Sequence, residues 1–450
     1  MTRKVYIKTW GCQMNEHDSQ VVEGLLRQEG YVRVDREQDA DLIYLNTCSV
    51  REKAEHKMYS QLGEYKDLKA DKPGLMIAVG GCVAQQERET ITRRAPYVDL
   101  VVGTHQFRKI NELVAQAAAV RTPEKTSSHE VKTQWIMGDA DERFDEPSWQ
   151  LEPGQHSAMI TVMEGCDQLC SFCIVPFTRG RELSRPAEEI LSRARQYAQQ
   201  GVREIMLLGQ NVNAYGKKNP EYPSFARLLR SVCEIPGIER VRFTSPHPQD
   251  FSRELAEVYR DMPNLCPHAH IPVQAGNDTV LTAMKRSYSN QVFRDTVAML
   301  RQYRPDIALT TDIIVGFPGE TESQFADTLQ LIEDIDFEQI FAFVYSPRPF
   351  TPARKLDDPV PLATKQAWLQ TLNNRQNALQ LARNQSFVGQ NVEVLWAKWD
   401  AHDQQLDGRT PHGRLVHIAL DSDGQRWVGQ ITPARVTRAF AHSLVAEFVH

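Results

Sequence analysis

The first 120 residues alternate between two hydrophobic patterns. Short apolar stretches bounded by polar residues predict strands, at Val5–Trp10, Asp41–Thr47, Leu75–Gly80 and Val98–Val102. The segments between and after them have helical spacing and predict helices, at Asp18–Gln28, Val50–Leu68, Ala84–Arg94 and Gln106–Ala118. Because strands that alternate with helices favour a parallel sheet with helices on its faces, we expect an α/β domain here.

A second series of strands begins after residue 157. Apolar segments predict six strands, at Met159–Met163, Glu204–Leu208, Arg240–Thr244, Ala269–Val273, Ala308–Val315 and Ile340–Val344. The segments between these strands are amphipathic with helical spacing, so we expect an incomplete barrel of six strand–helix units. Barrels of this kind carry their sites at the carboxyl ends of the strands.

The C-terminal residues have a different pattern. A helical segment, Ala363–Asn384, leads to short strands predicted at residues 392–399, 414–420, 426–436 and 443–449, with turns at Asp407–Gly408 and Asp421–Gly424. This spacing favours a small antiparallel barrel of OB-like size. Residues 121–150 are polar and weakly periodic, which indicates a linker with at most one short strand. We expect domain limits at 1–121, 122–151 (linker), 152–385 and 386–450.

Three cysteines follow predicted strands of the N-terminal sheet. Cys12, Cys48 and Cys82 each come directly after one strand and before one helix. Because ligands of open parallel sheets bind beyond the carboxyl ends of the strands, we expect the three thiols to meet at one edge. The helix starts favour thiolates there. Three separately buried core cysteines are the alternative interpretation.

A second group of cysteines lies just after the first predicted barrel strand, at Cys166, Cys170 and Cys173. A structural zinc site uses four closed ligands, and the next cysteine, Cys233, lies far away in a predicted helix. Three thiolates on a tetranuclear iron–sulfur cluster would leave one iron open to a small molecule. A zinc site or a purely structural cluster is the alternative.

Composition and charge narrow the function classes. The chain has 450 residues, 41% of them hydrophobic and 24% charged, and a net charge of −6, so nothing in the overall charge indicates nucleic acid. In residues 387–450 six Lys or Arg stand against seven Asp or Glu. Four arginines there form either one phosphate-facing edge or a solvated mixed-charge face: Arg409, Arg414, Arg435 and Arg438. The N-terminus lacks a signal peptide core and no apolar run approaches the ~20 residues of a membrane span, so we expect a cytoplasmic protein.

The segments around the cysteines resemble the methylthiotransferase family of radical S-adenosylmethionine (SAM) enzymes over nearly the whole chain. KTWGCQMN, NTCSVREKAE and VGGCVAQQE surround the first three cysteines, and CSFCIVPFTRGRELSRP contains two of the second three. TSPHP, HIPVQAG, MKRSYS and GFPGETE match further blocks of that family. CQMN and CSVREKAE point to its MiaB branch, whose members modify isopentenylated tRNA.

This resemblance implies a cofactor set and a reaction. It implies an N-terminal α/β domain, a radical SAM barrel and a C-terminal TRAM domain, with two 4Fe–4S clusters on Cys12, Cys48 and Cys82 and on Cys166, Cys170 and Cys173. The implied reaction adds a methylthio group to carbon 2 of isopentenyl-adenosine beside the tRNA anticodon. One SAM gives a 5′-deoxyadenosyl radical and a second SAM gives the methyl group. Both clusters must face one cavity, so the N-terminal sheet edge should pack over the carboxyl face of the barrel.

The resemblance also implies partners and SAM contacts. The partners are the anticodon stem-loop of tRNA, SAM and an electron donor such as flavodoxin or ferredoxin, and we expect a monomer without membrane contact. Related barrels contact SAM at the end of the second strand, which makes Gln210 and Asn211 candidates. Asp312 and Gly316 end the fifth strand, where a glycine lets the backbone approach an adenine ring, although a turn needs it equally.

The remaining polar and sulfur-bearing residues receive no catalytic role, and no catalytic residue is assigned. We interpret three histidines as hydrogen-bonded loop residues and two cysteines as core packing: His247, His268, His270, Cys233 and Cys266. Two alternative functions remain at this point. One is a methylthiotransferase for a threonylcarbamoyl-type tRNA adenosine or for a ribosomal protein. The other is a non-enzymatic iron–sulfur protein that binds RNA or carries electrons.

Overall fold

The N-terminal part is a parallel sheet covered by helices on both faces. A computed structural model describes residues 2–49, 52–120, 144, 151 and 154–449. Five strands pair in parallel in the order β2-β1-β3-β4-β5. They are β1 (Arg3–Trp10), β2 (Tyr31–Arg33), β3 (Leu42–Thr47), β4 (Met76–Gly80) and β5 (Leu100–Val102). The predicted α/β domain is therefore confirmed, and only the short β2 was not predicted.

Alternating side chains of these strands supply two cores. Tyr44 of β3 packs with α1 (Gln13–Gln28) and α5 (Ile110–Val120), whereas its neighbours Ile43 and Leu45 pack on the opposite face. That face is covered by α2 (Glu52–Asp71), α3 (Gly81–Glu87) and α4 (Glu89–Arg94). Because successive strand residues point to opposite faces, a strand buried on both faces is apolar throughout. The single helix predicted over residues 84–94 is in fact interrupted at Arg88, which has a φ of 50°.

The central part is the predicted open barrel of six parallel strands. They run in chain order as β6, β9 and β10, then β11, β12 and β13, with an isolated bridge from Val241 to Leu265 between the two halves. Their bounds are β6 (Ser157–Thr161), β9 (Glu204–Leu208), β10 (Arg240–Phe243), β11 (His268–His270), β12 (Ala308–Val315) and β13 (Gln339–Val344). The segment between β6 and α7 contains three short elements, β7 (Met163–Glu164), α6 (Val175–Thr178) and β8 (Leu183–Ser184).

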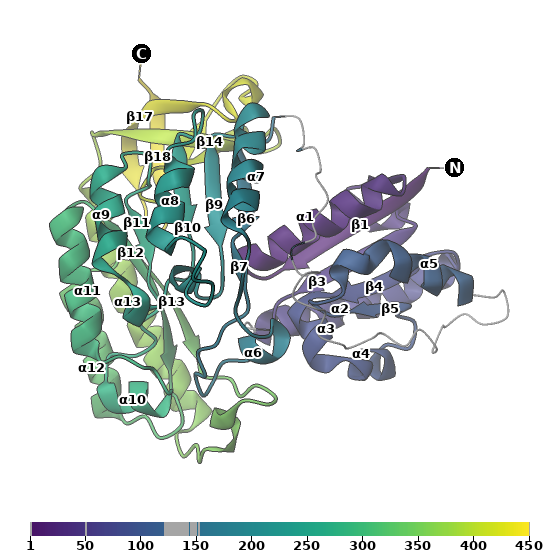
Figure 1. Ribbon diagram of the computed structural model, residues 1–450, viewed down its shortest axis with the longest axis horizontal. Coiled ribbons are helices and arrows are strands. Elements are labelled where there is room, and N and C mark those ends of the chain that lie inside the picture. Colours follow the sequence, from purple (N-terminus) through teal and green to yellow (C-terminus); the bar gives the residue numbers. More distant parts are fainter. Residues whose placement is uncertain (1, 50–51, 121–143, 145–150, 152–153, 450) are drawn as a thin grey trace.

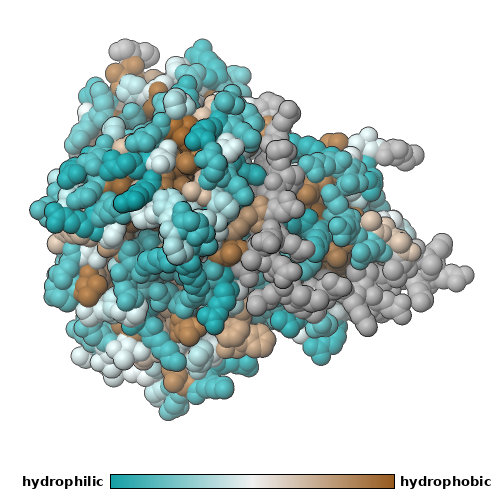
Figure 2. All heavy atoms as spheres, in the orientation of Figure 1, coloured by the Kyte–Doolittle hydropathy of each residue, from teal (hydrophilic) through white to brown (hydrophobic). Residues whose placement is uncertain are grey.

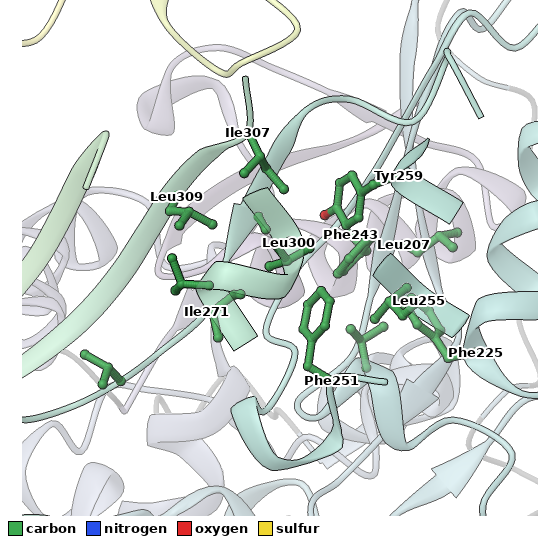
Figure 3. Close-up of a cluster of buried hydrophobic side chains, with 14 of the residues drawn as sticks. Leu207, Phe225, Phe243, Phe251, Leu255, Tyr259, Ile271, Leu300, Ile307 and Leu309 are labelled. Carbon is green, nitrogen blue, oxygen red and sulfur yellow. The ribbon is translucent and has the colours of Figure 1, made fainter. Parts of the chain in front are cut away.

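Helices cover the outside of this barrel. They are α7 (Ala187–Gln199), α8 (Phe225–Cys233), α9 (Arg253–Asp261), α10 (Asp278–Ala283), α11 (Asn290–Tyr303) and α12 (Glu322–Ile335). Ser, Asn or Thr side chains accept the first backbone N–H groups of α8 to α12, which fixes where each helix begins. Between strands and helices, the ring of Phe243 packs against those of Phe225 and Tyr259, in one cluster with Leu207 and Ile271 (Figure 3). Burying such side chains contributes about 1.5–3 kcal/mol each.

The C-terminal part is a small closed barrel that follows α13 (Leu362–Gln385). Its strands pair in the order β14-β15-β16-β18-β17, namely β14 (Asn391–Asp400), β15 (Gln405–Arg409), β16 (Leu415–Ala419), β18 (Leu444–Phe448) and β17 (Ile431–Ala439). The turn predicted at Asp407–Gly408 is wrong, because both residues lie inside β15. Gly408 belongs there because a Cβ would lie 2.4 Å from Val394 and 2.7 Å from the Trp396 ring.

The N-terminal part and the small C-terminal barrel contact different ends of the central barrel (Figure 1). The carboxyl ends of the N-terminal strands point towards the barrel, beside α6. The small barrel instead contacts the amino-terminal ends of the central strands. There Arg240 donates to the Arg409 carbonyl (2.8 Å), and Arg242 donates to the Thr410 and Pro411 carbonyls (2.9 Å each).

One residue of the predicted phosphate-facing edge lies in this joint. Arg414 pairs with Glu338 (2.7 Å, side chains 10% and 9% exposed) and stacks over Phe387. The prediction of a phosphate contact is therefore wrong for Arg414. Its guanidinium is already paired with the Glu338 carboxylate of the central barrel. Arg409, Arg435 and Arg438 are exposed.

Two sequence predictions concern segments that the structure does not place. The linker predicted over residues 121–150 lies outside the described residues, apart from Phe144, whose carbonyl accepts from Arg185. The domain limits stay a prediction. No helix in the described part of the chain is long and apolar enough to cross a membrane.

Candidate cofactor sites between the N-terminal sheet and the barrel

The N-terminal cysteines follow three neighbouring strands. Cys12 follows β1, Cys48 follows β3, and Cys82 is the second residue of α3 after β4. The Cys12 and Cys48 thiols share a hydrogen bond, and the charge of Cys12 acts on Cys82. The expected convergence at one sheet edge is therefore present. It follows from the register, since Trp10 pairs with Thr47 and Asn46 with Gly80.

A buried amide network holds this edge in shape. Asn46 donates to the Asn15 carbonyl (2.9 Å) and to Ser19 Oγ (2.9 Å), and Asn15 donates back to Asn46 Oδ1 (3.0 Å). Gly81 has a φ of +87°, and a Cβ there would lie 2.2 Å from Asn46 Oδ1. The network therefore fixes the start of α1 against the end of β3, and it leaves no room for a side chain where β4 turns into α3.

The three thiols are wholly or partly buried, and the guanidinium of Arg179, itself paired with Asp18, acts on two of them. The hydrogen bond with Cys48 and the charge of Arg179 lower the pKa of Cys12 to about 6, although burial acts in the opposite direction. Burial raises the pKa of Cys82, while Arg179 opposes that rise. Three convergent thiols beside a fixed cation suit an anionic iron–sulfur cluster, because thiolates are the ligands of such clusters.

The second cysteine group occupies one loop between β7 and α6. Cys173 N–H donates to the Cys170 carbonyl (3.1 Å), and Cys166 N–H donates to the Gly180 carbonyl (3.1 Å). Gly165 must be glycine at the start of this loop, because its φ is +80° and a Cβ would lie 2.1 Å from the Arg181 carbonyl oxygen. These contacts fold the loop so that the three thiols lie near one another.

Arg286 supports this loop from the opposite side of the barrel. Its guanidinium donates to Cys170 Sγ (3.2 Å), to the Pro272 carbonyl (3.1 Å) and to the Tyr288 hydroxyl (2.9 Å). Burial raises the pKa of both Cys166 and Cys173 to about 12. These thiols thus keep their protons until a cation replaces them, as metal ligands do.

Polar atoms without partners lie next to this loop. Gln210 accepts from Gly165 N–H (2.5 Å), and Asn211 donates to Glu182 (3.2 Å) and Asp250 (3.1 Å). Gln210 Nε2, Asn211 Oδ1 and both ring nitrogens of His247 are buried with no hydrogen-bond partner in the described structure. Because buried polar groups nearly always have partners, these three side chains fit a polar ligand such as SAM.

The other two predicted SAM contacts lie on another strand of the barrel, Asp312 within β12 and Gly316 directly after it. Asp312 Oδ2 is 3.4 Å from His270 Nε2. Gly316 has a φ of +68°, its N–H donates to Glu320 (2.6 Å), and a Cβ there would lie 2.4 Å from Lys365. The turn and its packing on Lys365 explain why residue 316 is a glycine. The predicted contact of Gly316 with SAM stays a prediction.

The histidine and cysteine interpretations have mixed outcomes. His268 and His270 are hydrogen-bonded to Thr310 (3.3 and 3.0 Å), as expected, but they lie in β11 and not in a loop. The interpretation is wrong for His247: its ring contacts Tyr288, but its two ring nitrogens have no hydrogen-bond partner among the described residues, and burial lowers its pKa to about 3. Cys233 and Cys266 are 5% and 3% exposed, as packing residues should be.

Buried contacts between the two parts bring both cysteine groups to one interface. Arg179, six residues after Cys173, forms a two-pronged ion pair with Asp18 of α1 (2.5 and 3.2 Å). Arg108 pairs with Glu164 (2.9 Å), and Thr104 donates to the Thr178 carbonyl. The expected packing of the N-terminal sheet edge over the barrel is thus confirmed. Sequence reasoning missed Arg179, Arg286 and Asp18, although the first two lie in the segments TRGRE and MKRSYS.

No three His, Cys, Asp or Glu side chains among the described residues gather closely enough to hold a single metal ion. The two convergent groups consist of thiols alone, which is the ligand set that proteins give to iron–sulfur clusters.

Comparisons with known proteins agree with this architecture. Residues 4–103 match the Uncharacterized protein family UPF0004, and residues 160–332 match the Radical SAM superfamily. Among solved structures, the radical SAM methyltransferase TsrM from Kitasatospora setae, with cobalamin and a 4Fe–4S cluster bound, aligns with a TM-score of 0.57 at 15% identity, covering 79% of this chain and 77% of that one. The cobalamin-dependent SAM radical enzyme OxsB aligns with a TM-score of 0.54 at 12% identity, over 84% and 56%. Fold and superfamily together define a radical SAM enzyme.

Curated relatives narrow the family. A protein from Chromobacterium violaceum is 44% identical over 99% of this chain and 98% of its own length, and one from Geobacter metallireducens is 44% identical over 98% of each. One from Ralstonia pickettii is 45% identical over 99% and 97%. All three are named tRNA-2-methylthio-N(6)-dimethylallyladenosine synthase. The chain belongs to this family.

Proposed function

We propose that this enzyme transfers a methylthio group to carbon 2 of N(6)-dimethylallyladenosine beside the anticodon of tRNA. The observation that carries this proposal is the meeting of two three-thiol groups at one buried interface, in a chain whose full-length relatives bear that enzyme name. The relatives' names favour this substrate over a threonylcarbamoyl-type adenosine or a ribosomal protein.

The target bond explains why such equipment is needed. The C–H bond at carbon 2 of adenine is strong and not acidic, so a side-chain base gains nothing by attacking it. A 4Fe–4S cluster held by Cys166, Cys170 and Cys173 would supply, with SAM, the one-electron chemistry needed to remove this hydrogen atom. The protein's own part is to position the reactants and to exclude water.

Each group of residues has a separate task in this proposal. Cys166, Cys170 and Cys173 would hold the SAM-cleaving cluster, with Arg286 fixing Cys170 in place. Gln210 and Asn211 would bind SAM through their unpartnered atoms, joined by Asp312 of β12 and by Gly316 directly after that strand. The auxiliary cluster, which holds the sulfur to be transferred, would be bound by Cys12, Cys48 and Cys82.

The wider setting follows from the substrate. The protein would work in the cytoplasm, where tRNA is found, as a monomer. A one-electron donor such as flavodoxin or ferredoxin would reduce the cluster. The small C-terminal barrel, with the TRAM pattern of the sequence, would contribute to tRNA binding.

Replacing Cys12 tests the division of labour. In Cys12→Ala we expect SAM cleavage to continue while methylthiolation of the RNA stops, because only the auxiliary site loses a ligand. Iron content should fall from about eight to about four per chain, since each cluster has four irons. The assay measures 5′-deoxyadenosine, modified nucleoside by mass spectrometry, and iron. Cys233→Ala, which removes a buried cysteine outside both groups, should leave all three unchanged. Loss of SAM cleavage in Cys12→Ala would contradict the assignment.

A further inference from the structure

A small pocket opens beside the interface that joins the two cysteine groups. Its volume is about 110 Å³, and its lining comes from three separate segments of the chain. Gln85, Gln86 and Arg88 follow Cys82, whereas Ile174, Phe177 and Thr178 follow Cys173, and Phe350 comes from the loop after β13. The pocket thus lies within a few residues of both cysteine groups along the chain.

One wall of the pocket is apolar and exposed. The rings of Phe177 and Phe350 lie 5.8 Å apart at an angle of 33°, and they are 47% and 59% exposed. Ile174 is buried behind them. Figure 2 shows hydrophobic surface over α6, between the barrel and the N-terminal part. Two large exposed aromatic rings in contact mark a surface that binds a partner rather than solvent.

The opposite wall offers one unpartnered acceptor. Gln86 is 8% exposed, and its amide nitrogen donates to Glu87 (2.9 Å), whereas its Oε1 has no hydrogen-bond partner in the described structure. A buried carbonyl oxygen without a partner is costly, so it indicates that a ligand N–H or O–H completes the site. Arg88 brings a positive charge to the same wall, which favours RNA phosphates.

Two residues of this pocket have a strained backbone. Seven residues other than glycine have a positive φ in the described structure, and two of them line the pocket, Arg88 (50°) and Phe350 (66°). A bulky residue in the left-handed region is disfavoured, and such outliers persist mainly at functional sites. Phe350 is therefore held against Phe177 at a cost to the fold.

We propose that this pocket binds the dimethylallyl group of the tRNA adenosine, with Gln86 Oε1 accepting the N6–H. The inference rests on the proposed function and adds the residues that read the substrate. A dry cavity of ~150 Å³ holds benzene, so a pocket of 110 Å³ has room for about five carbons, the size of a dimethylallyl group. The secondary amine that bears this group keeps one N–H, which matches the single acceptor on Gln86.

The test compares binding of two anticodon stem-loop RNAs, one with and one without the dimethylallyl group, to the holoenzyme. Fluorescence anisotropy gives Kd for each RNA. In Phe177→Ala and Phe350→Gly we expect the preference for the dimethylallyl RNA to fall about tenfold or more, since even one methylene in a pocket is worth about tenfold. In Gln86→Ala we expect both RNAs to bind more weakly by a similar factor, because both carry an N6–H.

Controls separate a binding role from a structural one. Phe350→Gly relieves the left-handed backbone, so its thermal midpoint should equal or exceed that of the wild type while its preference falls. Phe440→Ala removes an exposed ring (52%) from the distant small barrel and should keep the preference. An unchanged preference in both Phe177→Ala and Phe350→Gly overturns the inference, as does a wild type with no preference. If the preference depends on these rings but no methylthio group is formed, the pocket stands and the proposed function fails.

Discussion

Arg179 is the residue through which the barrel acts on the N-terminal cysteines. It is 3% exposed, it pairs with Asp18, and its charge acts on both Cys12 and Cys82. A buried cation must be paired to persist, and Asp18 provides that pairing from the first helix of the other part. An Arg–carboxylate pair with two parallel bonds also fixes orientation. The pair therefore sets where the barrel loop stands relative to the auxiliary cysteines.

Replacing Asp18 tests whether the Asp18–Arg179 ion pair stabilises the interface. In Asp18→Asn the buried Arg179 loses its counter-charge, and breaking such a pair costs about 3–5 kcal/mol. We expect a clear fall in the anaerobic thermal midpoint. Glu188→Gln removes one partner of an exposed pair, Arg195–Glu188, whose side chains are 52% and 77% exposed, and should shift the midpoint little. Equal midpoints for the two variants would show that the buried pair does not stabilise the interface.

At the scale of single elements, the turn from β12 to α12 contains a carboxyl group with an unusual environment. Glu320 is 2% exposed and accepts from the Gly316 and Phe317 N–H groups (2.6 and 3.1 Å). Burial nevertheless raises its pKa from 4.5 to about 7. Between these two values the folded chain keeps a proton that the unfolded chain has released. Stability therefore falls as the pH rises through this window and levels off above it.

Glu320→Gln should remove this part of the pH dependence. Each tenfold change in proton affinity is worth about 1.4 kcal/mol, so the effect is on the order of 3 kcal/mol between pH 4.5 and 7. We expect the wild type to lose more stability than the variant between pH 5.5 and 8 in urea unfolding. Glu221→Gln, in an exposed loop, should follow the wild-type profile. Parallel profiles for the wild type and Glu320→Gln would contradict the prediction.

For the whole molecule, the two ends of the barrel have different tasks. The cysteine groups lie at the carboxyl end of the strands, whereas the small barrel is fixed to the amino end through Arg240, Arg242 and Arg414 (Figure 1). The net charge of −6 gives no general attraction for RNA. If the small barrel contributes to tRNA binding, as proposed, the attraction must come from local cations on its surface.

Arg435 and Arg438 of β17 are exposed cations of that barrel. If they contact phosphates, Arg435→Ala and Arg438→Ala should each weaken tRNA binding and reduce the slope of log affinity against log salt by about 1. The thermal midpoint should not change, because both side chains are exposed. Arg195→Ala, an exposed position on α7, is the matched control. A salt slope equal to that of the wild type in both variants would remove the small barrel from the RNA interface.

The sequence by itself determined the elements and the two cysteine groups. Apolar spacing marks most strands, although not β2 or β15. Parallel strands bring Cys12, Cys48 and Cys82 to one edge because their carboxyl ends share it. The local pattern gave a wrong prediction at Gly408, where it indicated a turn. This glycine lies in a strand because the neighbouring Trp396 ring leaves no room for a side chain.

Only the tertiary structure decided which side chains meet between the parts. Asp18 and Arg179 form an ion pair although they are 161 residues apart. Arg414, which was predicted to face RNA, instead pairs with Glu338 of the central barrel. Phe177 and Phe350 likewise come together from distant segments. Strands and helices have fixed periods of side-chain direction, so they produce recognisable hydrophobic patterns in the sequence. Contacts between separately folded parts depend on how those parts pack, and no sequence period corresponds to them.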